Sequence, residues 1–532
     1  RIDAGDVARS IRAVGGRSVR AAGRRLPAPI RAALRETPLT RLVVGSGDGP
    51  PQPTFSVVIP IYESPLSHLR EQLEAVRTQT YPLWECVVVD DGSPSSDAVD
   101  LAEEFAAIDD RFRVIRRAAN GGIAAATNDG LDAASNDWIV FSDHDDRMLP
   151  SALAAIATHL VSHPDDDVVY TDERLIDEDG RALVVYRKPD YSHHRFVAMN
   201  YFCHIVTMRR SLVEEIGRLD PAMEPSADRD FNLRASERAT SIGHVPDILY
   251  EWRAIDGSVA KDLTEKQGVS ESTLAGAAAH LARTGTPGRA VPAPRHPYLI
   301  RIERPPAVGS PTWLAWDDAT TVASLDDLLR DALDRGDRAG GADHVVLHHR
   351  AVEPGTWISP LQSLVELGGV GAAAPCVLTA DRRVVSAGRI HHPAMREMMP
   401  GVDVDDPGPW GLHQVDHEAA GVDPSAVVFD RAALGAIGGF DVDALLGPSA
   451  DRDDADSELA GEFGMDLFVA LVSTRLREYG TPVVWSPLST ITVPWEPPSW
   501  PDDLRRRAAS RRFGRIVPGL LVDPFSPIEI RR

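Results

Sequence analysis

The chain has 532 residues, of which 43% are apolar and 25% charged, so it is a globular protein of roughly two to four domains with sizeable cores. A net charge of −23 argues against nucleic acid as its main partner. The three distant cysteines, Cys86, Cys203 and Cys376, fit a reducing compartment without a zinc site, and no apolar run reaches the roughly 20 residues of a membrane span.

The N-terminal segment Arg1–Arg41 is basic, and Val7, Ile11 and Val14 recur in it at helical spacing. A basic amphipathic helix can lie on an anionic membrane surface, or it can pack on a neighbouring domain as a solvated helix. The sequence leaves both open. A Gly/Pro linker follows, and together they form an expected helical arm at residues 1–50.

From Phe55 onward, short apolar segments alternate with helical segments, which predicts an α/β fold: a mostly parallel, doubly wound sheet with helices on both faces. Strands of such a sheet end at the edge where ligands bind. The first predicted strands are Ser56–Ile61, Glu85–Val89, Phe112–Arg116 and Trp138–Phe141, and the helices are Leu66–Thr80, Asp97–Ile108, Ile123–Ala134 and one opened by Met148–Pro150.

Three more strands and three more helices are expected before a Pro-rich boundary at Gly285–Pro305, so the first domain is predicted at residues 51–290. His204 falls in one of these strands, where a satisfied core histidine is expected. The strands are Val168–Tyr170, Asn200–Arg209 and Ile248–Arg253, and the helices are Ser211–Leu219, one within Pro225–Glu237, and Gln267–Thr284.

The densest group of reactive side chains follows the strand Trp138–Phe141, in the sequence Ser142-Asp-His-Asp-Asp146. Asp143 and Asp145 are hard oxygen ligands, suited to a divalent cation whose remaining positions are filled by diphosphate oxygens. A solvated acidic turn at a helix start is the alternative, because Asp is favoured there in any case.

Other polar groups are expected at the same edge. Asp90 and Asp91 could hold a nucleobase and ribose hydroxyls, or form only a turn and helix cap. Asn120-Gly121-Gly122 could bring backbone amides to a phosphate, or be an ordinary loop. One of Asp228 and Asp230 could be a general base, or both could be ordinary residues at a helix N-terminus.

The C-terminal half repeats the pattern of the first domain in degenerate form. Pro448–Asp453 has the same letters as Pro225–Asp230. The strand Thr312–Trp316 is followed by Asp317 and Asp318, as the earlier strand Glu85–Val89 is followed by two aspartates. We therefore predict a second, smaller α/β unit at residues 291–500, followed by a Pro/Arg-rich tail at 501–532.

This second unit is predicted to lack an active site of its own. After the strand His344–Leu347 it has His348-His349-Arg350 where the first domain has its aspartates. Arginine repels a cation, and two neutral histidines without a carboxylate are a poor site for Mg²⁺. Packing, acceptor binding or dimerisation are the roles left to it.

Nine segments between about Phe55 and Ala260 resemble, in order and spacing, the family 2 glycosyltransferases with a GT-A fold. The segments are SVVIPIYE, RTQTYPLWECVVVDDGS, NGGIAAATNDGL, WIVFSDHDD, YTDERLIDEDGR, RKPDYS, NYFCHI, PSADRDFNL and ILYEWR with a following GS. The resemblance implies that Asp228 is the catalytic base and that Asp143 and Asp145 bind Mn²⁺ or Mg²⁺. It also implies nucleotide-sugar contacts by Pro60, Tyr62, Glu63, Asp90, Asp91, Asn120, Gly121 and Asp143.

Three positions depart from the family pattern. Glu251 stands where a histidine usually precedes the Trp-Arg pair, which puts a third metal ligand in doubt. Thr127 replaces an arginine of many relatives, and Ala227 replaces a frequent Glu or Gln before the base.

The resemblance implies an inverting, metal-dependent transfer of a sugar from a UDP-, dTDP- or GDP-sugar to a hydroxyl of a cell-surface glycan or polyprenyl-linked acceptor. The expected location is the cytoplasm, with peripheral contact to the inner face of the membrane through Arg1–Arg41 and homo-oligomerisation left open. One alternative is a catalytically weak carbohydrate-binding or scaffolding protein of a polysaccharide assembly complex. The other, a nucleotidyltransferase, needs a Gly-rich phosphate loop where this chain has PIYE.

Overall fold

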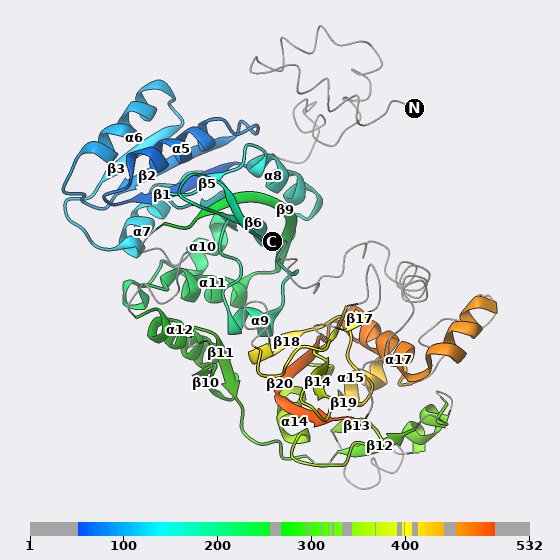
Figure 1. Ribbon diagram of the computed structural model, residues 1–532. Helices are drawn as coiled ribbons and strands as arrows, with labels where there is room; N and C mark the ends of the chain where they lie inside the picture. Colours follow the sequence, from blue (N-terminus) through cyan, green and yellow to red (C-terminus); the bar gives the residue numbers. More distant parts are fainter. Residues whose placement is uncertain are drawn as a thin grey trace, which may run out of the picture.

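The computed structural model describes residues 52–255 and, with gaps that include 256–267, 332–342 and 441–453, the chain as far as residue 494 (Figure 1). The expected N-terminal arm with Arg1–Arg41, the tail at 501–532 and the repeated segment Pro448–Asp453 lie outside the described residues. In the described part, the chain builds two large sheets, each accompanied by helices.

The first sheet has nine strands, and its order along the main path is β3-β2-β1-β4-β8-β6-β9-β5. These strands are β1 (Phe55–Ile61), β2 (Trp84–Asp90), β3 (Phe112–Arg116), β4 (Trp138–Phe141), β5 (Arg147–Met148), β6 (Asp166–Ile176), β7 (Ala182–Tyr186), β8 (Val206–Arg209) and β9 (Ser241–Arg253). The first four in sheet order are parallel, as the alternating pattern predicted. Strand β8 then runs antiparallel to both β4 and β6, whereas β6 and β9 are parallel. The expected α/β class is confirmed, with a mixed sheet beyond β4.

Helices cover both faces of this sheet. Alternate residues of a strand point to opposite sides, so the apolar residues of one strand form a core on each face. Val57 and Ile59 of β1 pack in one core cluster, and Val58 between them packs in the other. Gly130 lets one helix approach β1 closely, since a Cβ there would lie 2.4 Å from a methyl carbon of Val58. The helices are α5 (Leu66–Arg77), α6 (Asp97–Ile108), α7 (Ile123–Ala133), α8 (Ala152–Ser162), α9 (His193–Ala198), α10 (Arg210–Ile216), η1 (Pro221–Met223), α11 (Ala227–Arg238) and α12 (Val269–Thr284).

Two local predictions were wrong. The helix expected to open at Met148–Pro150 begins at Ala152, because Arg147 and Met148 pair with β9 as a short strand. Only Val206–Arg209 of the predicted strand Asn200–Arg209 is a strand. Side chains bind the backbone of the part before it: the Lys188 ammonium donates to the carbonyls of Phe202 and His204, and the His204 amide donates to Glu173.

The second sheet has seven strands, with the order β12-β13-β19-β14-β20-β18 and β15 beside β14. Its strands and helices are β12 (Thr312–Trp316), β13 (His344–His349), α14 (Ile358–Glu366), β14 (Ala372–Leu378), β15 (Val384–Ser386), β18 (His417–Glu418), β19 (Ala426–Asp430), α15 (Arg431–Ala436), α17 (Asp454–Glu478) and β20 (Val483–Thr492), with a separate ribbon of β16 (Arg389–Ile390) and β17 (Arg396–Glu397).

The two sheets share a topology. The path β12-β13-β19-β14-β20 has the same succession of parallel and antiparallel neighbours as β1-β4-β8-β6-β9. A hairpin partner also accompanies each matching strand, β7 beside β6 and β15 beside β14. Among its described residues, the second sheet has no counterpart of β2 or β3. The internal repeat inferred from short sequence segments thus has a matching strand order.

A hairpin joins the two units. It consists of β10 (Arg289–Pro292) and β11 (Ile300–Glu303), and Ala290, Ile300 and Ile302 pack in a core cluster of the first unit. The predicted division after residue 290 falls within this hairpin and stays a prediction. In the part of the chain that the structure describes, every helix is too short or too polar to span a bilayer.

Candidate active site

The carboxyl ends of β1, β2 and β4 meet at one edge of the first sheet. Pro60 lies near the end of β1, and the Tyr62 and Glu63 side chains that follow are exposed. The backbone of Glu63 has a positive φ of 44°, and its amide donates to the Ser93 hydroxyl at 3.1 Å. The structure therefore brings Glu63 next to the loop that begins at Asp91.

Asp91 organises the glycine loop. Its carboxylate accepts hydrogen bonds from the amides of Gly121 at 3.0 Å and Gly122 at 2.8 Å, and it pairs with Arg117. Glu224 accepts from the next free amide of α7, that of Ala124, at 2.9 Å. The amides considered for phosphate are thus bound by carboxylates of this chain. Asn120, beside them, is exposed.

Asp90 is completely buried at the end of β2. Its Oδ1 accepts from the Ser93 amide at 3.2 Å, and its Oδ2 lies 3.5 Å from Arg116. These contacts agree with the turn-forming alternative considered for this residue. Sequence reasoning missed Glu224, which no motif singled out.

Strand β9 fixes the acidic turn after β4. The Asp143 amide donates to the Tyr250 hydroxyl at 3.0 Å. The buried Arg253 donates through Nε to the Asp145 carbonyl and through its amide to the Asp146 carboxylate, both at 2.8 Å. The four-residue turn is therefore a defined structure and not a loose surface loop.

Asp143, Asp146 and His204 form a group that could hold a metal ion, with one ligand atom from each lying within 4.8 Å of the others. His204 Nε2 is 3.6 Å from the Asp143 carboxylate and 4.0 Å from that of Asp146. Asp145 lies beside the group, close enough for its charge to raise the pKa of Asp146, but it is not one of the three converging residues.

The protonation of this group suits a cation. Asp146 is buried, one of its carboxylate oxygens has no hydrogen-bond partner, and burial together with Asp145 and Asp143 raises its pKa well above the usual range. A divalent cation would offset this unfavourable charge. Burial lowers the pKa of His204, which favours the neutral imidazole that metals bind.

Sequence reasoning did not include Asp146 or His204 among the candidate ligands, and it expected His204 to be a satisfied core histidine. Its ring packs on Tyr250, with ring centroids 5.0 Å apart, and faces the acidic turn. The segment Asn200–Ile205 is not a strand, so the strand pattern could not predict where this side chain points.

Glu251, the position that put a third ligand in doubt, is engaged elsewhere. It is buried between Arg147 and Arg174, and the Arg174 Nε donates to it at 2.7 Å. Burial opposes its ionisation, but the hydrogen bonds from the two arginines outweigh that effect and lower its pKa. It is a structural carboxylate in this arrangement.

Asp228 lies at the start of α11 and reaches solvent, and Asn200 donates to its carboxylate at 2.9 Å. The surrounding protein, with a contribution from Asp143, raises its pKa. Asp230, in contrast, is buried and paired with Arg234 at 2.9 Å and Arg283 at 3.1 Å. Of the two candidates for a base, only Asp228 is exposed enough to reach a substrate.

The second unit differs at the matching place. His348 and His349 are the last residues of β13 and not a loop after it, because they pair with β12. They point to opposite faces: His348 contacts Trp313, and His349 contacts Trp316. Arg350 pairs with Asp317 at 3.0 Å. No group of three potential metal ligands occurs among the described residues of this unit.

A further group in the first unit, His159, His163 and Asp166, lies at the amino end of β6, opposite the edge described above. His159 and Asp166 are joined at 2.7 Å, which ties the end of α8 to the sheet.

Residues 56–217 match the sequence model of the family described as "Glycosyl transferase family 2". The matched segment lies within the region whose motifs indicated a resemblance to the family 2 glycosyltransferases. The segment contains the acidic turn and His204. Asp228 lies beyond its end.

Two curated relatives resemble part of the chain. The uncharacterized protein y4gI of Sinorhizobium fredii is 35% identical over 242 residues, which are 45% of this chain and 26% of that protein. The O-antigen biosynthesis protein RfbC of Myxococcus xanthus is 33% identical over 264 residues, or 49% of this chain and 20% of RfbC. The chain thus spans about a quarter of these relatives or less. Among solved structures, Staphylococcus aureus TarS 1–349 in complex with UDP-GlcNAc has a TM-score of 0.37 at 20% identity, covering 43% of this chain and 66% of that one.

Proposed function

We propose that the chain is an inverting, metal-dependent glycosyltransferase that moves a sugar from a nucleotide-sugar to a hydroxyl of a glycan or lipid-linked acceptor. The observation that carries the proposal is one of position. Asp143, Asp146 and His204 converge next to the exposed Asp228, at the carboxyl edge of a family 2 sheet. The name of the relative RfbC, an O-antigen biosynthesis protein, supports a cell-surface polysaccharide as the acceptor.

In the proposed reaction, Asp228 accepts the proton of the acceptor hydroxyl, and that oxygen forms a bond to the anomeric carbon. The bond from this carbon to the diphosphate oxygen breaks, and its electron pair leaves with the nucleoside diphosphate. The raised pKa of Asp228 makes its carboxylate a stronger base at neutral pH. Asn200 holds the carboxylate in place, and Tyr62 and Glu63 frame the base and ribose.

When bound, Mn²⁺ or Mg²⁺ would neutralise charge on the leaving diphosphate. Asp143, Asp146 and His204 are the residues that would hold it, and Asp145 lies beside them. The chemistry of this donor set, two carboxylates and one neutral imidazole, suits Mn²⁺ at least as well as Mg²⁺.

We also propose the division predicted from the sequence: a catalytic unit, a second unit without an active site, and a basic arm that contacts the inner face of the membrane from the cytoplasm. The second unit's lack of converging ligands among its described residues supports this division of roles.

Release of nucleoside diphosphate from UDP-, dTDP- and GDP-sugars, measured with Mn²⁺, Mg²⁺ or EDTA, tests the proposal. We expect release with one donor class, dependent on metal and lost in Asp228→Asn. A chain that binds glycans but releases no nucleotide from any of these donors would instead be the binding or scaffolding protein considered above.

A further inference from the structure

A second group of potential metal ligands lies at the edge of the first sheet opposite the acidic turn. It consists of His159 near the end of α8, His163 just after that helix, and Asp166 at the start of β6. One ligand atom from each lies within 4.8 Å of the others. Helix α8 packs against β9, so the group lies on the sheet that carries the candidate active site at its other edge (Figure 1).

The spacing of these residues suits a single ion. His159 and His163 stand four residues apart, as do helical pairs of histidines that bind zinc, because residues at this spacing share one face of a helix. Their rings stack, with centroids 4.3 Å apart and planes at 16°. Asp166 follows three residues later, and its amide donates to the His163 carbonyl at 3.2 Å. The turn after α8 thereby returns the carboxylate to the two imidazoles.

An arginine from a neighbouring strand holds this turn in place. Arg209 of β8 donates through Nη2 to the carbonyls of Pro164 and Asp166, both at 2.8 Å. Its Nε donates to the Asp167 carboxylate at 2.7 Å. The charge of Arg209 is therefore paired with Asp167, while its hydrogen bonds to the backbone fix the position of Asp166.

The hydrogen bonds of His163 leave its other nitrogen suited to a metal. Nδ1 lies 3.1 Å from the His159 carbonyl oxygen, which can only accept, so Nδ1 carries the proton. The lone pair of the neutral ring is then on Nε2, and the side chain is exposed. Histidines that bind metals commonly donate their other ring N–H to a carbonyl or carboxylate in this way.

A glycine allows the other two ligands to meet. His159 Nε2 and Asp166 Oδ2 are 2.7 Å apart, and both lie against the backbone of Gly243 in β9. A Cβ at this position would be 2.3 Å from the nitrogen and 2.2 Å from the oxygen, so any side chain there would displace both ligands. The imidazole and the carboxylate thus converge in a space that glycine alone leaves open.

The donor set favours Zn²⁺. It has two imidazole nitrogens and one carboxylate oxygen, and a fourth position remains for water. Hard cations such as Mg²⁺ and Ca²⁺ prefer sites made of oxygens. Ligands of a tetrahedral zinc ion are about 3.3 Å apart, a separation that a rotation of the exposed His163 ring would provide. The group also lies at the carboxyl end of α8, where the helix dipole favours positive charge.

We infer that His159, His163 and Asp166 bind a zinc ion that joins the end of α8 to the first sheet. The site is separate from the candidate active site, whose two carboxylates and single imidazole suit Mn²⁺ or Mg²⁺. The inference does not depend on the proposed sugar transfer. The bound ion would stabilise the helix that follows the acidic turn, and it would take no part in the reaction.

Titration calorimetry of Zn²⁺ into a tag-free full chain with Asp143→Ala tests the inference, because this change removes a ligand of the other group. We expect one zinc ion per chain to bind with micromolar affinity or better, and Co²⁺ to show the visible absorption of a tetrahedral complex. In this background, His163→Gln and Asp166→Asn should each weaken zinc binding at least about tenfold. Asp165→Asn, at an exposed neighbour outside the group, should leave it unchanged.

Thermal unfolding separates lost metal binding from a folding defect. Zinc should raise the melting temperature of the Asp143→Ala chain, because it binds only the folded state. His163→Gln, a change at an exposed side chain, should keep the metal-free melting temperature and lose this increase. Zinc binding only at millimolar concentrations or not at all, equal affinities in His163→Gln and Asp165→Asn, or equally tight binding of Mg²⁺ would each overturn the inference.

Discussion

A path of five strands has the same order in both sheets, but different residues follow the matching strands β4 and β13. After β4 come Asp143 and Asp146, which converge with His204. At the end of β13, His349 packs on Trp316 and Arg350 pairs with Asp317. The same backbone plan can therefore present a cation site or a closed ion pair, depending on a few residues where one strand ends.

The surroundings differ as well. In the first unit, Tyr250 and Arg253 of β9 hold the acidic turn through its backbone, because the Asp143 amide donates to Tyr250 and Arg253 donates to the Asp145 carbonyl. The second sheet also lacks, among its described strands, counterparts of β2 and β3. In the first unit Asp91 directly follows β2, at the edge where a nucleotide is expected.

The largest effect is expected from a change that removes a potential metal ligand from the first unit and so makes it more like the second. Asp143→Ala should lower metal-dependent binding of a nucleoside diphosphate by at least about 100-fold, because a converging carboxylate is lost. Asp145→Ala should also abolish that binding if Asp145, which lies beside this group, is a further ligand. Titration calorimetry with Mn²⁺ measures both, with the exposed surface variant Asp132→Ala as control. Unchanged affinity in Asp143→Ala would refute the metal site.

The second prediction concerns the base. Asp228→Asn keeps size and the contact with Asn200 but cannot accept a proton, so turnover should fall by a factor of about 100 or more while donor affinity is kept. Steady-state kinetics and donor binding measure the two quantities separately. Near-normal turnover would exclude Asp228. The paired Asp230 would then be an unsuitable replacement, because two arginines already bind it.

Sequence patterns predicted those parts of the fold and site that depend on local periodicity. The four parallel strands and the placement of Asp143 and Asp145 after β4 follow from short apolar runs that end in polar residues. The repeat was visible in the letters, and the strand order matches it. Asp228 and Asp230 were both candidates, and only their different pairing with arginines distinguishes them.

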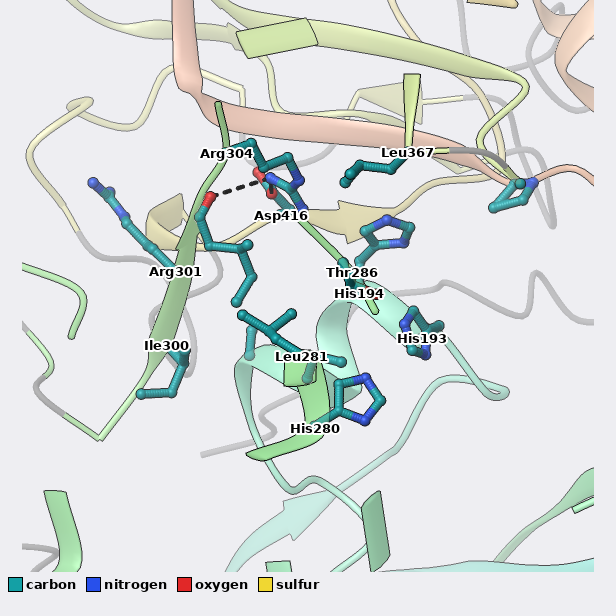
Figure 2. Close-up of a pocket in the computed structure, with 15 residues that line it drawn as sticks. His193, His194, His280, Leu281, Thr286, Ile300, Arg301, Arg304, Leu367 and Asp416 are labelled. Carbon is teal, nitrogen blue, oxygen red and sulfur yellow. Dashed lines mark hydrogen bonds and ion pairs between the residues drawn. The ribbon is translucent and has the colours of Figure 1, made fainter. Parts of the chain in front are cut away.

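The remainder depends on long-range contacts that no local pattern encodes. His204 reaches the acidic turn because Lys188 and Glu173, which are distant in the sequence, bind the backbone around it. The glycine-loop amides are bound by Asp91 and by Glu224, which lies 100 residues away from its partner Ala124. A cavity of about 250 Å³ between the two units likewise needs residues from both, such as Leu281 and Pro482 (Figure 2).

A third prediction compares stability at low pH in two places: where α9 packs against β18, between the two units, and in the strands of the two sheets. Burial lowers the pKa of His417 to about 4. Burial raises the pKa of Glu418, but the charge and hydrogen bonds of His194 outweigh that effect and lower it to about 2. Both pKa values lie below those of an unfolded chain, so the unfolded state binds more protons. The free energy of unfolding therefore decreases as the pH is lowered. The His417 contribution is lost between about pH 6.5 and 4, and that of Glu418 below about pH 4.5.

Hydrogen exchange at pH 7 and pH 5 measures this effect. The amides of α9 and β18 should lose protection at pH 5 before those of β1 and β13. His417→Phe, which removes the titrating ring from its place beside Trp485, should reduce the loss. Equal loss throughout the molecule would show that acid does not act first at the junction.

The smallest effect is expected in the second unit. Arg350→Ala should change turnover and nucleotide affinity less than about twofold, because the Arg350–Asp317 ion pair is exposed to solvent, which screens it. If Arg350 only blocked a latent metal site, its removal would instead create Mn²⁺ binding beside His349. The strand geometry argues against this, because His348 and His349 point to opposite faces and cannot share an ion. Crystals of Arg350→Ala soaked with Mn²⁺ and a nucleoside diphosphate decide between these outcomes. Density only beside Asp143 would support a second unit that has no metal site. Density beside His349 would mean that Arg350 alone prevents metal binding in the second unit.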